Sequence, residues 1–137
     1  FRRTGQRRDL NREKFEANKL IELLKNFDSP ASKNISYLSH VIKVRSRLRA
    51  FHPEAFMKCI SNTIDNCIII QRGLEEDIVY VICNMSDKLL KFNLLNELNL
   101  SVLSSKISLL DNITGSILNP DEFELNPYQV VWVSLTD

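Results

Sequence analysis

Glycine is scarce in this chain, with three residues in 137, and the three lie far apart in the sequence. A Gly-rich loop of the kind that wraps phosphate groups is therefore excluded. Histidine is rarer still, with His40 and His52 alone, and no Cys-x-x-C spacing accompanies them. A zinc site is not expected from such a set. No Ser/His/Asp arrangement stands out either, so we expect no catalytic residues, no metal and no cofactor in this chain.

Long apolar runs are also missing. No uninterrupted stretch approaches the roughly 18 residues of a membrane-spanning helix, and no segment is typical of a signal peptide. Cys59, Cys67 and Cys83 all stand in apolar, strand-like contexts, which predicts buried, reduced thiols. The net charge of +1 indicates neither nucleic acid nor membrane as a partner. We therefore expect a cytoplasmic protein.

Two β-rich runs, residues 67–72 and 78–85, are the most regular feature of the sequence. Both are nearly continuously apolar and rich in β-branched residues, and a polar stretch with one glycine, residues 73–77, separates them. This pattern predicts an antiparallel hairpin with a five-residue loop. Because neither run alternates between apolar and polar residues, we expect a central position with both faces covered.

Residues before the hairpin have helical periodicity. An apolar stripe from Phe15 to Phe27 predicts one helix, with Asn11 as a possible N-cap. Ser29 followed by Pro30 is a start signal for a second helix, over residues 30–50. One face of this helix would carry Ile35, Leu38, Ile42, Arg45 and Leu48, and Val41 and Val44 would widen it. Its basic far end, with Arg45, Arg47 and Arg49, is explained by the helix dipole alone.

From residue 56 onward the pattern is that of strands. We expect strands over residues 56–60, 66–72, 78–85, 89–95, 107–111 and 128–135. Residues 99–105 are ambiguous, and residues 117–123 form a loop or bent strand around Pro120. Alternation places Tyr128 and Trp132 in the core rather than on a sugar-stacking surface. The fold class expected is α+β: two N-terminal helices followed by an antiparallel β-sandwich.

The first 14 residues form a basic segment, with six Arg or Lys residues against two acidic ones. Two interpretations are open for this segment. It is either an anion site for phosphate or a nucleic-acid backbone, or a solvated loop. Nucleic acid is the less favoured partner, because no aromatic residues interleave with the arginines and the rest of the chain is neutral.

Three motifs, in this order and spacing, resemble the sucrose phosphorylase and glucosylglycerate phosphorylase group of glycoside hydrolase family 13. Residues 7–15, Arg-Arg-Asp-Leu-Asn-Arg-Glu-Lys-Phe, are similar to the group's Arg-Asp-Ile-Asn-Arg stretch. Residues 45–56 resemble the end of the last barrel helix. Residues 111–115 with 125–132 resemble the close of the C-terminal β domain. Glu13 departs from the sucrose phosphorylase pattern, and Phe51-His52-Pro53 fits the glucosylglycerate phosphorylases better.

The resemblance implies that residues 1–55 are the end of a TIM-type (β/α)8 barrel and that residues 56–137 are an all-β C-terminal domain. It also implies that residues 1–14 follow the eighth barrel strand, on the face where such barrels hold their active sites. Arg8 would bind phosphate or an acceptor sugar through its guanidinium, and Asn11 and Arg12 would shape the same loop. Sugar and inorganic phosphate are the implied partners.

The implied reaction is retaining glucosyl transfer, with a nucleophilic Asp and an acid/base Glu on earlier barrel strands. Neither carboxylate would lie in this chain, so the chain alone is expected to be inactive. The alternative is a stand-alone β-sandwich binding module with a basic arm, which would hold a carbohydrate or a protein.

Overall fold

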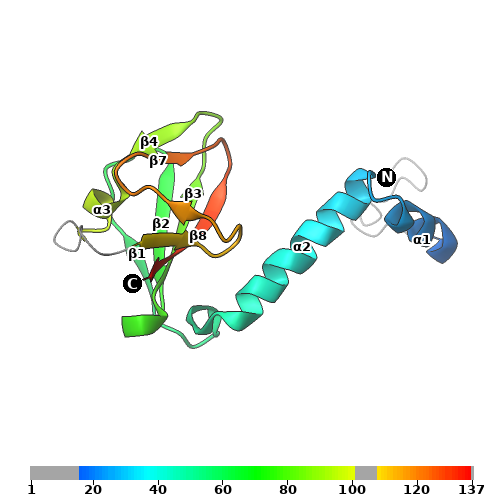
Figure 1. Ribbon diagram of the computed structural model, residues 1–137, viewed down its shortest axis with the longest axis horizontal. Coiled ribbons are helices and arrows are strands. Elements are labelled where there is room, and N and C mark those ends of the chain that lie inside the picture. Colours follow the sequence, from blue (N-terminus) through cyan, green and yellow to red (C-terminus); the bar gives the residue numbers. More distant parts are fainter. Residues whose placement is uncertain (1–15, 101–107, 137) are drawn as a thin grey trace, which may run out of the picture. The chain divides into compact units, whose positions relative to one another are not determined.

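The computed structural model describes residues 16–100 and 108–136 of the chain (Figure 1). The chain divides into two compact units, residues 1–40 and residues 41–137. The border expected between residues 55 and 56 stays a prediction.

Two helices precede the sheet, α1 (Ala17–Lys25) and α2 (Pro30–Arg47). Ser29 caps α2 as the sequence predicts: its Oγ accepts a hydrogen bond from the Ser32 backbone N–H at 3.1 Å and donates to the Leu23 carbonyl at 2.7 Å. The Ser29 hydroxyl therefore satisfies one of the free N–H groups at the helix start. The expected cap Asn11 and the apolar Phe15 lie outside the described residues.

The apolar stripes of both helices are exposed. Leu20, Ile21 and Leu23 of α1 contact solvent, as do Ile35, Leu38 and Ile42 of α2. The helical periodicity was thus predicted correctly, but these faces are not buried among the described residues. At the C-terminal end of α2, part of the predicted face is covered: Val41, Val44 and Leu48 pack against an apolar cluster on the sheet.

Six strands form an antiparallel sheet in the order β1-β2-β3-β8-β5-β6, and two more strands pair as a small second sheet, β4-β7 (Figure 1). The bounds are β1 (Met57–Ile60), β2 (Cys67–Arg72), β3 (Val79–Asn84), β4 (Leu90–Phe92), β5 (Ser108–Asp111), β6 (Ile117–Leu118), β7 (Phe123–Leu125) and β8 (Val130–Thr136). The α+β class with an antiparallel C-terminal β domain is confirmed.

The predicted hairpin lies inside the large sheet, with Cys67 opposite Asn84 and Arg72 opposite Val79. Its second strand is covered on both faces, as expected for a continuous apolar run. Tyr80 and Ile82 join the main core with Ile69, Leu109 and Val133. On the opposite face, Val79 and Val81 pack with Ala50, Ile113 and Trp132. The first strand of the hairpin, β2, is not covered on both faces, because the Ile68 side chain is 40% exposed.

Two expected elements are different in the structure. The strand expected over residues 89–95 stops at Phe92, and a short helix, α3 (Leu94–Glu97), follows it. Asn93 causes the change: its Oδ1 accepts a hydrogen bond from the Asn96 N–H at 3.0 Å and caps the helix. The second expected helix ends at Arg47 instead of residue 50, because Leu48 has an extended backbone and a 3-10 turn, η2 (Arg49–Phe51), follows.

Two predictions of burial were also wrong. Cys59 is exposed, because β1 is an edge strand, whereas Cys67 is buried and Cys83 is half-buried; all three thiols are free. Tyr128 is 69% exposed with a φ of 56°. This left-handed backbone breaks the alternation that the sequence pattern assumed, and β8 begins only at Val130. Trp132 is buried as predicted.

Buried polar groups tie the two sheets together. The Asn84 amide, at the end of β3, donates to the backbone carbonyls of Lys88, Leu125 and Asn126 at 2.7, 3.2 and 2.9 Å. Its Oδ1 accepts from the N–H and Oγ of Ser86. A fully bonded buried amide holds its neighbours in one arrangement, so Asn84 fixes where β7 ends relative to β3.

Candidate functional site

The site residues expected from the sequence, Arg8, Asn11 and Arg12, lie outside the described residues. Their grouping into one anion-binding loop therefore stays a prediction. Within residues 16–100 and 108–136, no group of three or more His, Cys, Asp or Glu side chains is placed to hold a metal ion. No helix in the same ranges is long and apolar enough to cross a membrane.

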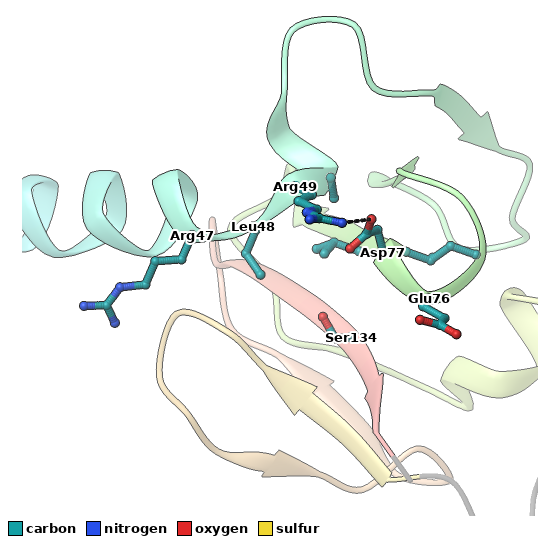
Figure 2. A pocket seen from close by; sticks show the side chains of 9 residues that line it. Arg47, Leu48, Arg49, Glu76, Asp77 and Ser134 are labelled. Atoms are coloured by element: carbon teal, nitrogen blue, oxygen red, sulfur yellow. Dashed lines mark ion pairs between the residues drawn. The ribbon is translucent and has the colours of Figure 1, made fainter.

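A pocket of about 280 Å³ lies where α2 ends on the β domain (Figure 2). The end of α2 and the turn after it form one wall, the η3 turn (Glu75–Asp77) forms another, and β8 contributes a third. The lining residues are Arg47, Leu48, Arg49, Ala50, Glu76, Asp77, Ile78, Val79 and Ser134. Sequence reasoning missed this site, because it explained the arginines by the helix dipole and assigned the acidic residues to a hairpin loop.

Charges of both signs lie around this pocket. An Arg49 guanidinium nitrogen is 4.0 Å from an Asp77 carboxylate oxygen, while Arg47 points away from the pocket (Figure 2). Ser134 Oγ accepts a hydrogen bond from the Asn112 amide at 2.7 Å. Within residues 16–100 and 108–136, this amide is the side chain that bonds the Ser134 hydroxyl, and an amide is not a base that activates a nucleophile. The arrangement offers charged groups and a hydroxyl to a small polar ligand.

A second hollow of about 560 Å³ shares Arg47, Leu48 and Arg49 with the first and continues along the turn to Pro53. Arg45 lines it and donates through Nη2 to the Phe51 carbonyl at 3.2 Å. The Arg45 guanidinium is thus bonded to the protein's own backbone, which leaves fewer of its N–H groups for a ligand.

A third hollow of about 380 Å³ lies on the small sheet, between β4 and β7. Its side chains bind one another: Lys91 pairs with Glu124, and the Asn93 amide donates to Asp121 Oδ1 at 2.9 Å. The hydrogen bond to Glu124 raises the pKa of Lys91, and the negative charge of Glu124 adds to this rise. These exposed pairs are typical of a solvated surface.

The fold of this chain is similar to part of the solved structures of AmyP. The AmyP variant in complex with maltotriose matches 79% of this chain with a TM-score of 0.59, at 14% sequence identity and over 22% of its own length. AmyP in complex with maltose matches 77% of this chain with a TM-score of 0.56, at 13% identity and over 21% of its length. At such identities the likeness shows the fold. No protein-family model matches the chain.

One curated protein is similar to this chain in sequence. The glucosylglycerate phosphorylase of Allomeiothermus silvanus is 35% identical over 88 residues, which are 64% of this chain. The chain spans only 16% of the length of that relative. This relative belongs to the group of phosphorylases that the motifs of the sequence resemble, and the match bears out that resemblance over the 88 aligned residues.

Proposed function

We propose that the chain is the C-terminal part of a retaining, α-glucosyl-transferring sugar phosphorylase. The observation that carries this proposal is the 35% identity to a glucosylglycerate phosphorylase. The likeness of the fold to AmyP supports it independently of the sequence match.

In the proposed reaction, a carboxylate attacks the anomeric carbon of the donor and displaces the acceptor moiety, which takes its proton from the general acid. Inorganic phosphate then attacks the glucosyl-enzyme and forms glucose 1-phosphate, while the carboxylate leaves. Phosphate must compete with water at this second step. A guanidinium fork offers two parallel hydrogen bonds to phosphate oxygens, and we assign this role to Arg8, with Asn11 and Arg12 beside it.

The class of enzyme is tested by phosphate-dependent release of glucose 1-phosphate from glucosylglycerate and from sucrose, each offered separately to the complete gene product. Release from glucosylglycerate is the expected result. Release from sucrose alone would keep the class and change the donor. Release of free glucose without phosphate dependence would indicate a hydrolase. If no barrel is encoded with this chain, the binding-module interpretation replaces the proposal.

The role of Arg8 is tested by Arg8→Ala, with Arg3→Ala as the matched control in the same basic segment. Loss of one charge-assisted fork costs about 1.5–3 kcal/mol, so kcat/KM for phosphate should fall at least tenfold. Arg3→Ala should change it by less than about twofold. A normal phosphate dependence in the Arg8 variant would refute the assignment.

A further inference from the structure

The turn that joins α2 to β1 presents three successive backbone carbonyls to two arginines. Arg72, on β2, donates through Nε to the Ala50 carbonyl at 3.1 Å and through Nη2 to the His52 carbonyl at 2.9 Å. Arg45, on α2, donates to the Phe51 carbonyl between them at 3.2 Å. We name these two guanidinium groups and the carbonyls of residues 50–52 the arginine clasp.

The clasp supplies donors that the turn cannot provide for all of its carbonyls. Within η2, the Leu48 and Arg49 carbonyls accept from the N–H groups of Phe51 and His52 at 3.0 and 2.9 Å. The carbonyls of Ala50 and Phe51 accept from the guanidinium groups instead. Helix ends leave such acceptors without intrahelical partners, and charged donors satisfy them most strongly.

Apolar packing lies directly beside the clasp. Ala50 is 1% exposed, and the Phe51 ring centroid is 4.5 Å from that of Trp132. Gly73, which follows Arg72, has no side chain where Ala50 packs. A Cβ at Gly73 would lie 3.3 Å from the Ala50 Cβ. The turn is therefore held from one side by core packing and from the other by the guanidinium fork.

We infer that Arg72 and Arg45, as the arginine clasp, are positioning residues that join the C-terminal part of α2 to the sheet, so that residues 41–53 move with the β domain as one body. A planar fork can bond two carbonyls at once, which a lysine ammonium on a single stem reaches less well. This inference uses only contacts within residues 41–137 and is independent of the proposed function.

The test is hydrogen–deuterium exchange of the whole protein, read by mass spectrometry on peptides that cover residues 41–55. Arg72→Met should accelerate exchange in these peptides at least tenfold and leave β3 and β8 unchanged. Arg72→Lys should be intermediate, because one of the two bonds can be kept. The control Arg47→Met removes an exposed arginine that points away from the turn. Peptides 41–55 of this variant should exchange at the wild-type rate. Wild-type exchange in Arg72→Met would overturn the inference.

A second variant keeps the test decisive if Arg72→Met does not fold. Arg45→Met removes only the bond to Phe51, and we expect about threefold faster exchange in the same peptides. It should also raise acrylamide quenching of Trp132, the single tryptophan of the chain, because the Phe51 ring covers it. Unchanged exchange and quenching in Arg45→Met would overturn the inference.

Discussion

The sheet and the two helices use their apolar residues in opposite ways. In the sheet, residues from β2, β3, β5 and β8 meet in a core where Ile69, Ile82, Leu109 and Val133 are fully buried. In the helices, Ile21, Leu38 and Ile42 are 49%, 56% and 63% exposed. Strands of this chain pair with one another, so their apolar side chains are buried within the chain itself. The sequence of an amphipathic helix indicates which of its faces is apolar, but not what covers that face. Periodicity therefore predicts an element without saying whether its face is covered.

The largest effect is expected where the sheet and the turn after α2 pack together. Trp132→Ala removes a buried ring that contacts Phe51, and we expect a loss of about 3–5 kcal/mol in the free energy of unfolding. Urea titration followed by circular dichroism measures it. The control Tyr128→Ala should change stability by less than about 0.5 kcal/mol. A similar loss in both variants would show that Tyr128 is packed.

One substitution made in both regions sharpens the comparison. Leu109→Ala creates a cavity in the closed core and should cost about 2–5 kcal/mol. Leu38→Ala removes an exposed side chain from α2, where alanine has the higher helix propensity, and should cost less than about 0.5 kcal/mol. Thermal unfolding of the two variants gives both values. A large loss for Leu38→Ala would mean that the helical face is covered.

Alanine substitutions at two glycines would distinguish the cost of a strained backbone from the cost of steric crowding. Gly73 and Gly115 have φ values of 76° and 75°, but a Cβ at Gly73 would lie 2.4 Å from the Asp77 carbonyl oxygen, and one at Gly115 would meet nothing within 4 Å. Gly115→Ala should cost about 1–2 kcal/mol for the left-handed backbone alone. Gly73→Ala should cost about 3 kcal/mol, because overpacking adds to this. Equal losses in chemical denaturation would contradict the crowding at Gly73.

The smallest effect concerns the cysteines of the sheet. Burial, with smaller contributions from Cys83 and Glu97, raises the pKa of the Cys67 thiol from 9.0 to about 11. The unfolded chain therefore loses this proton first, and stability that is present below pH 9 is lost as the pH rises through 11. Between pH 8 and pH 10 the loss should be about 1 kcal/mol.

Cys67→Ala should remove this part of the pH dependence, as measured by urea unfolding at both pH values, and Cys59→Ala should retain it. Iodoacetamide at pH 8 should modify the exposed Cys59 and leave Cys67 protected. Equal rates of modification would show that the Cys67 environment is open in solution.

Local signals in the sequence predicted much of the fold. Ser29-Pro30 predicted the start of α2, and the apolar runs on either side of Gly73 predicted the central hairpin. The pairing of β3 with β8, and of β4 with β7, joins residues far apart in the chain and left no such signal. The assignment of Arg8, Asn11 and Arg12 to an anion site follows from the family resemblance. The pocket at the end of α2 was not predicted, because its walls come from three separate segments.

By itself, the sequence determined the two N-terminal helices followed by strands, the antiparallel hairpin, and the resemblance to sugar phosphorylases, because capping, β-branching and motif residues act over a few neighbouring positions. Only the tertiary structure decided that Tyr128 is exposed, that α2 ends at Arg47, and that Arg72 bonds the turn between α2 and β1. Each of these three features depends on backbone torsion angles or on contacts between distant segments. Local periodicity in the sequence encodes neither the torsion angles nor the contacts.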